Sequence, residues 1–323
     1  MQDLENSRPS TDGTSYIGID VSKSHLDVYV HPHNILFQVS NDKQGHKQLN
    51  RRLKNIGPLL VIMEATGKYH RAAHRALVAN TIDVAIVNPY RTHAFTHSLG
   101  QWAKTDAIDA KMLALYGAMI QPQVVKPTPR PLECLRELVS ARRNAKADKT
   151  RLSNRLGESK SLFVRTRLKA RIRQLERHIA SFDVEIARLI KTDPNMAKRF
   201  AIITSVPGLG PVNAATMIGE MPELGSCDEK QIAALVGVAP MANESGSFKG
   251  KRRIRGGRKA VRDPLYMAAL SAIKIYPAMR TFQNRLMANG KEFKRAITAV
   301  MRKLIVLINV LIKENRKWTP IAP

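Results

Sequence analysis

The stretch "SYIGIDVSKSHLDVYV", residues 15–30, decides the fold expected for the first part of this chain. Two apolar runs separated by a short polar segment predict two strands joined by a tight turn. Asp20 interrupts the first run, and Asp27 interrupts the second. A carboxylate inside a buried strand costs free energy unless its charge is compensated, so each aspartate needs an explanation.

Strand-like and helical patterns alternate up to about residue 120 and predict an α/β domain built on a mixed sheet. The proline-rich segment "QPQVVKPTPRP", residues 121–131, then predicts a domain boundary. We therefore expect a disordered N-terminal extension over residues 1–14 and a catalytic domain over residues 15–130. The expected strands are 16–22, 25–31, 35–39, 59–63 and 82–87, and the expected helices are 43–55, 69–79 and 106–119.

Residues 131–195 are expected to form long paired helices that join protomers. Apolar residues recur there at alternating steps of four and three, the pattern of a coiled coil or helical hairpin. An amphipathic helix packed on the core of its own domain is the alternative. Residues 196–323 are predicted to form a mainly helical domain, with a helix-hairpin-helix-like motif at 205–219. The heptad positions are Leu168, Ile172, Leu175, Ile179, Phe182, Ile186 and Leu189.

The charge balance points to a polyanionic partner. The 323 residues carry 53 Lys plus Arg against 26 Asp plus Glu, a formal net charge of +27. Nucleic acid is the first choice for such a chain. A membrane is not expected, because the longest apolar run, residues 304–312, is about half of the ~20 residues that a spanning helix needs. Cys134 and Cys227 fit neither a zinc motif nor a disulfide framework, which favours a reducing, cytoplasmic location.

Four carboxylates follow or interrupt the expected elements of the first domain. Two come from strands, and two lie three residues apart on one helix face. If they converge at the end of the sheet, a divalent cation such as Mg²⁺ or Mn²⁺ would offset their repulsion. The structural alternatives are helix capping by Asp106, with Asp109 supporting the helix dipole, and a solvent-exposed edge strand for Asp20. The four candidates are Asp20, Glu64, Asp106 and Asp109, and Asp27 is interpreted as part of the scaffold.

A basic, glycine-containing segment at residues 243–262 predicts a mobile loop that becomes ordered on nucleic acid. Between residues 249 and 262 it contains eight Lys or Arg and no acidic residue, and these cations are candidates for phosphate contacts. These cations are Lys249, Lys251, Arg252, Arg253, Arg255, Arg258, Lys259 and Arg262.

Two histidine pairs have the i, i+4 spacing that could bind zinc: His70 with His74, and His93 with His97. Neither pair has an evident third ligand in the sequence. Surface or phosphate-contacting histidines are the favoured interpretation.

Several motifs in this order resemble the DEDD insertion-sequence transposases with a RuvC-like N-terminal domain, the recombinases guided by a bridge RNA. The resemblance extends over nearly the whole chain from residue 15. In the first half it is carried by "YIGIDVSKSHLDVYV" (16–30), "IMEATGKYH" (62–70), "IVNPYR" (86–91) and "AKTDAIDAKMLA" (103–114). In the second half it is carried by "SVPGLGPVNAATMIGEM" (205–221), "ALVGVAP" (234–240), "ESGS" (244–247) and "NGK" with "VMRKL" (289–291, 300–304).

The resemblance implies a ribonuclease H-like fold in which the four acids bind Mg²⁺. It also implies that Ser245 in "ESGS" is the nucleophile, with Ser247 as the neighbouring serine that is not. The family precedent is a tetramer, so we expect a homo-oligomer, from dimer to tetramer, that binds donor DNA, target DNA and one structured bridge RNA and would lie in the bacterial cytoplasm or nucleoid. Taken by itself, a serine in a basic glycine-flanked loop is a common loop residue.

These inferences together predict a site-specific DNA recombinase, or transposase, that acts through a 5′-linked phosphoserine. A metal-dependent junction resolvase or nuclease that uses water is the first alternative, because it needs the four acids and no serine. A non-catalytic protein that binds nucleic acid is the second alternative. This alternative requires that the four carboxylates take no part in catalysis.

Overall fold

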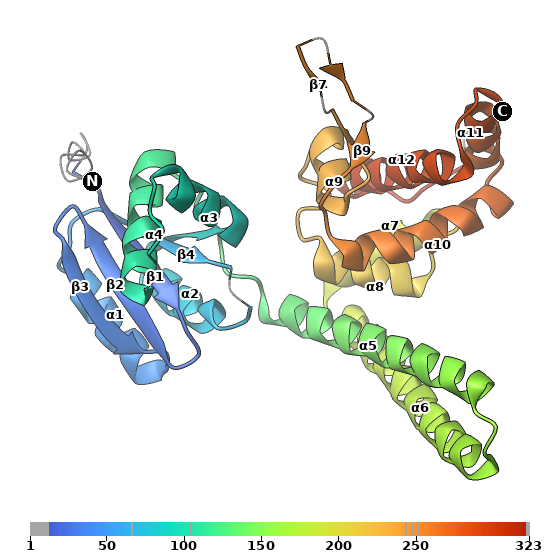
Figure 1. The fold of residues 1–323 in the computed structure, drawn as a ribbon, viewed down its shortest axis with the longest axis horizontal. Coiled ribbons are helices and arrows are strands. Elements are labelled where there is room, and N and C mark those ends of the chain that lie inside the picture. Colours follow the sequence, from blue (N-terminus) through green and yellow to red (C-terminus); the bar gives the residue numbers. More distant parts are fainter. Residues whose placement is uncertain are drawn as a thin grey trace. The chain divides into compact units, whose positions relative to one another are not determined.

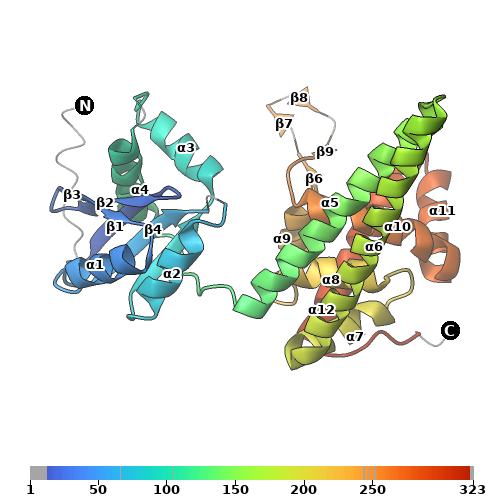
Figure 2. The same cartoon turned by 90° about the horizontal axis from the view of Figure 1, so that it is seen from below.

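The computed structural model describes residues 13–65, 67–103, 105–242, 244–246, 248–250 and 252–320, and the chain divides into two compact units at Thr128 and Pro129 (Figures 1 and 2). Residues 1–12 of the expected N-terminal extension, together with Lys251 and Ser247, lie outside the described residues. Within the described ranges, every helix is too short or too polar to serve as a membrane span.

The first unit is built on a five-stranded mixed sheet (Figure 1). The strand order is β3-β2-β1-β4-β5, in which the first three strands are antiparallel and β4 and β5 continue parallel to β1. This order and these directions are those of a ribonuclease H-like domain, so the expected α/β fold is confirmed. The strands are β1 (Ser15–Val21), β2 (His25–His31), β3 (Ile35–Ser40), β4 (Leu59–Glu64) and β5 (Asp83–Val87).

Helices cover both faces of this sheet (Figure 2). The helices α1 and α2 lie on one face and bury the larger apolar cluster of the unit against β1, β2 and β4. On the other face lie α4 and, beside it, α3. The helices are α1 (Lys43–Leu53), α2 (His70–Val78), α3 (Pro89–Ser98) and α4 (Asp106–Ile120).

The alternation of side chains along β1 sends one set to each helical layer. Ile17 and Ile19 are fully buried on the α1–α2 side. Gly18 faces α4, and a Cβ atom placed there would lie 1.9 Å from the carbonyl oxygen of Ala110. Only glycine therefore permits this close approach of helix and strand. Asp20, two residues farther on the same face, is brought to the start of α4.

The proline-rich segment after α4 is part of the first unit. The Val125 N–H donates to the carbonyl of Val84 in β5 at 2.8 Å. On the α2 side, His74 Nε2 bonds the Val125 carbonyl at 2.8 Å, and Arg75 donates to the Thr128 carbonyl at 2.9 Å. The segment expected to be a plain linker is therefore anchored to β5 and α2 up to the boundary between the two units. His74 has a structural role there, because its ring is hydrogen-bonded to the Val125 carbonyl.

The second unit begins with two long helices that lie side by side, α5 (Arg130–Glu158) and α6 (Leu162–Thr192) (Figures 1 and 2). The heptad positions of α6 are all buried or half-buried, and Leu168 and Ile186 are buried, as is Ile190 outside the heptad pattern. Ion pairs from Arg142 to Asp183, at 2.5 Å, and from Lys149 to Glu176, at 2.7 Å, join the two helices. The expected helical hairpin is confirmed within one chain.

A helical bundle with two short strand pairs completes the second unit. In the helix-hairpin-helix-like motif, Gly208 has a φ of 92° and packs against the backbone of α10, where a Cβ would meet Ala272 N at 2.6 Å. The helices are α7 (Pro194–Ser205), α8 (Pro211–Glu220), α9 (Glu229–Val236), α10 (Lys259–Ile275), α11 (Pro277–Ala288) and α12 (Phe293–Lys313). The short strands are β6 (Pro240–Met241), β7 (Glu244–Ser245), β8 (Phe248–Lys249) and β9 (Arg253–Ile254).

Candidate active site

The four predicted carboxylates gather where β1 and β4 end beneath the first turn of α4. The parallel pairing of Ile19 with Met63 brings the residues that follow them, Asp20 and Glu64, to the same end of the sheet. Asp106 and Asp109 lie in the first turn of α4. The helix begins there because Thr105 is its N-cap, whose hydroxyl accepts the Ile108 N–H at 3.3 Å.

Helix capping by Asp106 and an edge strand for Asp20 are both wrong, although Asp109 does lie in the first turn of α4. Asp106 is not the helix cap, because Thr105 holds that position. Asp20 does not lie on an edge strand, because β1 is the central strand of the sheet and Asp20 is half-buried.

The electrostatics of Asp20 show how closely these groups approach one another. Burial, followed by the carboxylate of Asp109, raises the pKa of Asp20 from 3.8 to about 6. Asp106 and Glu64 raise it further, and a hydrogen bond from the Val21 N–H opposes the rise. The four carboxylates therefore repel one another in one site, which is the condition that a bound cation would relieve.

A hydroxyl on α3 fixes one of these carboxylates. Thr92 is buried, and its hydroxyl donates to Glu64 Oε1 at 2.5 Å. This hydrogen bond holds the Glu64 side chain in a defined orientation. No local sequence pattern identifies Thr92, because the contact joins residues 28 positions apart.

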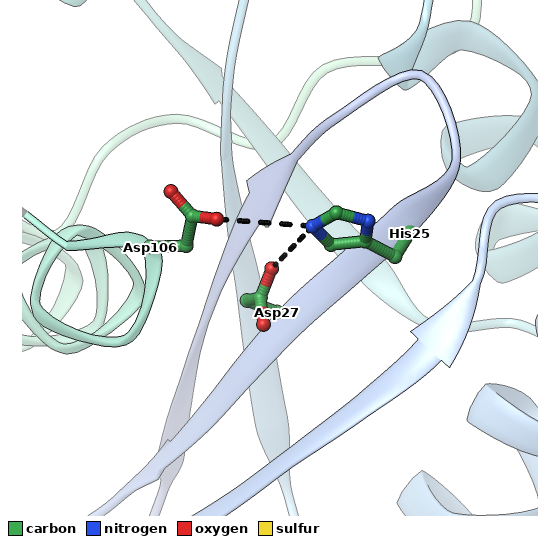
Figure 3. A group of neighbouring side chains, drawn as sticks. All are labelled: His25, Asp27 and Asp106. Carbon is green, nitrogen blue, oxygen red and sulfur yellow. Dashed lines mark ion pairs between the residues drawn. The ribbon is translucent and has the colours of Figure 1, made fainter.

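Asp27 belongs to the site, in contrast to its interpretation as scaffold. It pairs directly with Asp20 across the β1–β2 ladder, so the two side chains point to the same face. His25 Nε2 lies 3.4 Å from Asp27 Oδ2 and 3.7 Å from Asp106 Oδ2, so the three side chains converge from β2 and α4 (Figure 3). The hairpin register was a usable signal, since a turn centred on Lys23 and Ser24 places Asp20 opposite Asp27.

The two oxygens of Asp27 differ in their surroundings. Oδ1 accepts a hydrogen bond from Gln38 Nε2 at 2.8 Å. Oδ2 is buried and has no hydrogen-bond partner, and it faces the ring of His25. A buried carboxylate oxygen without a donor is costly unless a cation or a protonated group compensates for it.

These residues fit a divalent cation. Among the described residues, the one group of at least three potential ligands is His25, Asp27 and Asp106, with one ligand atom of each lying within 4.8 Å of the others. Carboxylate oxygens suit Mg²⁺ and Mn²⁺, and an imidazole nitrogen favours Mn²⁺ over Mg²⁺. We refer below to Asp20, Asp27, Glu64, Asp106 and Asp109 as the acidic cluster.

Divalent cation should stabilise the protein, and more strongly at neutral than at acidic pH. The pKa of Asp20 is raised in the folded state, so without metal the folded protein binds an extra proton between about pH 4 and 6, and its stability falls as pH rises through that range. A cation competes with these protons. The Mn²⁺-induced rise in Tm, measured by differential scanning fluorimetry, should therefore be larger at pH 7.5 than at pH 5.

Two variants make this prediction specific to the cluster. Asp27→Asn and Asp106→Asn should each reduce the rise in Tm at pH 7.5. Asp83→Asn is the matched control, because Asp83 is an exposed aspartate at the other end of β5 in the same unit. A rise that is equal at both pH values, or that Asp83→Asn reduces as much, would contradict the assignment.

Ser245, predicted as the nucleophile, lies in the second unit at the end of β7. It pairs with Phe248 across a tight turn that contains Gly246, whose φ is 55°. Ser245 is exposed. A hydroxyl in this position is accessible to a large substrate such as DNA.

The predicted basic loop has more regular structure than expected, since it contains β7, β8 and β9 and ends in the first turns of α10. Arg253 and Arg255 are exposed, as is Arg252. The side chains of Lys249 and Lys251 lie outside the described part of the chain.

Three of the predicted cations make contacts within the second unit. Arg258 donates to both carboxylate oxygens of Glu223, at 2.6 and 2.7 Å, and to the Glu220 carbonyl at 2.7 Å. Lys259 pairs with Asp263, one helical turn away. Arg262 donates to the Gly256 carbonyl at 2.6 Å. The geometry thus assigns Arg258 a role in holding the start of α10, and Arg253 and Arg255 remain exposed candidates for phosphate contacts.

Comparison with known proteins places these features in context. A family model described as "Transposase", of the DEDD type of IS110 elements, matches residues 17–159, and a second, described as "Transposase IS116/IS110/IS902 family", matches residues 200–284. The chain is 32% identical to the pilin gene-inverting protein of Moraxella bovis over 94% of its own length and 97% of that protein. It is 28% identical to an uncharacterized 42 kDa protein of insertion element IS900 from Mycobacterium paratuberculosis, over 46% of this chain and 39% of that protein.

Solved structures similar to part of the chain include RuvC of Thermus thermophilus in complex with a Holliday junction substrate. That likeness has a TM-score of 0.27 and 16% sequence identity, and it covers 35% of this chain and 99% of RuvC.

Proposed function

The chain belongs to the IS116/IS110/IS902 family of insertion-element transposases, and on that premise we propose that it is a site-specific recombinase guided by a structured bridge RNA. Membership in the family makes it an enzyme of DNA strand cleavage and transfer, with DNA as its substrate. The observation that carries the proposal is the acidic cluster, in which burial, followed by neighbouring carboxylates, raises the pKa of Asp20 to about 6. Such crowding is expected at a site built to hold a cation rather than at a surface patch.

The acidic cluster would hold Mg²⁺ or Mn²⁺, which when bound stabilises the negative charge on a phosphate and on its leaving oxygen. The chain's own residues prepare this position. Thr92 orients Glu64 through its short hydrogen bond. His25 lies between Asp27 and Asp106, so its ring limits how these two carboxylates turn.

We propose that Ser245 forms the covalent intermediate. Its hydroxyl oxygen attacks the phosphorus of a DNA phosphodiester, the bond from phosphorus to the 3′ oxygen breaks, and the 3′ oxygen leaves with a proton as a 3′-hydroxyl. The product is a phosphoserine joined to the 5′ end of the cut strand. Attack by the 3′-hydroxyl of another strand reverses these bond changes and releases the serine. The exchange therefore needs no external energy source.

This exchange joins two DNA sites, donor and target. The relative from Moraxella bovis is a pilin gene-inverting protein by name, and inversion of a gene is also an exchange between two sites. We propose that this chain performs the corresponding exchange for an insertion element.

With a guide RNA, the recognition of DNA would be shared between the protein and the RNA. Base pairing would read the sequence of both DNA sites, while the protein would contact phosphates. A net charge of +27 and the outward display of Arg253 and Arg255 support contacts with phosphates, which do not depend on sequence.

Ribonuclease treatment of the complex purified from cells should abolish recombination between a donor and a target duplex, because the guide is then lost. Re-adding a transcript of the element's non-coding end should restore recombination, and changing its pairing segments should redirect the product to a matching new target. Heat-inactivated ribonuclease is the control. Recombination that persists after the RNA is removed would contradict RNA guidance.

The paired helices α5 and α6 are the proposed surface for assembly into a dimer or tetramer. Residues 142–177 of these helices carry far more cations than acids, and this excess favours contacts with phosphates at their exposed positions, so nucleic acid would lie beside the assembly surface. Assembly would bring several catalytic sites to one pair of DNA molecules, as exchange of both strands requires.

A metal-dependent nuclease that uses water is the second candidate. The acidic cluster favours it, because the cluster lies within the first unit and needs no serine for hydrolysis. The two candidates differ in one product: a covalent protein–DNA intermediate forms only if a side chain is the nucleophile.

A further inference from the structure

Helix α3 is attached to the active site by one face and exposes the other. On the inner face, Thr92 bonds Glu64 of the acidic cluster. Phe95, also on this face, packs edge-on against Tyr116 of α4, with ring centroids 5.3 Å apart. The helix is therefore held by both the catalytic strand and the helix beside it.

The outer face of α3 carries rings at the spacing of three and four residues that defines one side of a helix. We call Tyr90, His93, His97 and Trp102 the α3 aromatic row. The His93 and His97 rings lie 4.3 Å apart, and Trp102, just past the helix, meets His97 edge-on at 5.0 Å. The rings of His93, His97 and Trp102 thus form a connected surface at the C-terminal end of α3.

This row is unusually open to solvent. Tyr90 is 76% exposed, and Trp102 is 79% exposed. Large aromatic side chains normally bury most of their area, so rings left this open mark a surface with a partner. At this exposure, at least one face of the Trp102 ring is open to solvent.

The position and charge of the row indicate which partner. Tyr90 and His93 flank Thr92, which touches the acidic cluster, and Trp102 precedes Asp106 by four residues. The sequence from residue 84 to residue 105 contains no Asp or Glu, and Arg91 on α3 is exposed. Flat rings in a segment that contains no acidic residue of its own, beside a phosphate-cleaving site, suit a nucleic-acid strand.

We propose that the α3 aromatic row stacks the unpaired bases of the DNA strand next to the phosphate that is cut. This assignment rests on the proposed function, since it places the row beside a DNA-cleaving site. Bases in a duplex are already stacked on one another, so their faces become available only when the strand is separated. Stacking on aromatic rings tolerates any sequence, which matches a protein whose targets are read elsewhere.

Trp102 is itself the probe for this contact. The chain has 2 tryptophans, and the other, Trp318, packs against Tyr276 in the second unit. In a Trp318→Phe protein, the emission of Trp102 is therefore recorded alone. A short single-stranded oligonucleotide, added in EDTA so that no cleavage occurs, should quench this emission by about twofold or more, while a duplex of the same sequence quenches it much less.

Affinity variants give a second measurement. Trp102→Ala should weaken binding of the oligonucleotide, followed by fluorescence anisotropy, by about tenfold, and Trp102→Phe should retain most of it. Phe163→Ala is the matched control, because Phe163 is an aromatic residue 69% exposed on α6. Because Trp102 is exposed, these substitutions should leave Tm unchanged.

The outcomes separate this inference from the proposed function. An Asp106→Asn protein, expected to be inactive, should still show the quenching. If the oligonucleotide binds by anisotropy while Trp102 emission stays constant, or if the emission changes with protein concentration before DNA is added, the row is not a base-stacking surface. The latter result would assign it to a protein contact.

Discussion

Asp106→Asn should reduce DNA strand cleavage by about 10³-fold, because it removes a charge from the acidic cluster and with it about 4 kcal/mol of transition-state stabilisation. The substitution keeps the size of the side chain and one oxygen. Asp106 is 64% exposed on its side chain, so no buried packing is lost. Cleavage of a labelled duplex under single-turnover conditions measures the effect directly.

The matched control for this prediction is again Asp83→Asn, an exposed aspartate at the far end of β5. It should retain full cleavage. DNA binding measured in EDTA should be similar for both variants, since the loss concerns chemistry and not affinity. An Asp106→Asn protein that cleaves at the normal rate would support a non-catalytic role for the cluster.

Ser245→Ala should abolish recombination and leave the metal-dependent stabilisation intact. Ser245 is exposed on β7 and belongs to a different unit from the acidic cluster, so its removal should not disturb the carboxylates. Recombinant product formed between donor and target DNA is the readout. The rise in Tm with Mn²⁺ serves as the check that the first unit is undamaged.

Ser247→Ala is the control for Ser245→Ala, since the two serines are separated by one glycine. It should recombine at a rate close to that of the unchanged protein. If the two variants lose activity equally, the loop as a whole is required and the nucleophile is not identified. If Ser245→Ala remains active, the serine mechanism is wrong.

The parts of the fold that could be predicted from the sequence are those fixed by local patterns. Alternation along residues 16–31 defined the first two strands, and the step of three between Asp106 and Asp109 placed both carboxylates on one helix face. The heptad positions of α6 likewise identified the face that packs on α5. In each case the periodicity of one element carries the information.

The parts that could not be predicted depend on contacts between distant segments. Thr92 reaches Glu64 only because α3 packs beside β4, and Arg258 is held by Glu223 from a different part of the bundle. No periodicity reveals either partner. Asp27 is intermediate, because its pairing with Asp20 follows from the hairpin register while its approach to Asp106 depends on where α4 packs.

The most direct test of the account is to trap and map the covalent intermediate. The protein is incubated with donor DNA, target DNA, RNA and Mn²⁺, and the mixture is denatured, digested with trypsin and nuclease, and analysed by tandem mass spectrometry. We predict a nucleotide joined through a 5′ phosphate to Ser245, within the peptide of residues 231–249 that also contains Ser247. Cleaved DNA with free 5′-phosphate ends and no adduct on Ser245 would contradict the account and identify water as the nucleophile.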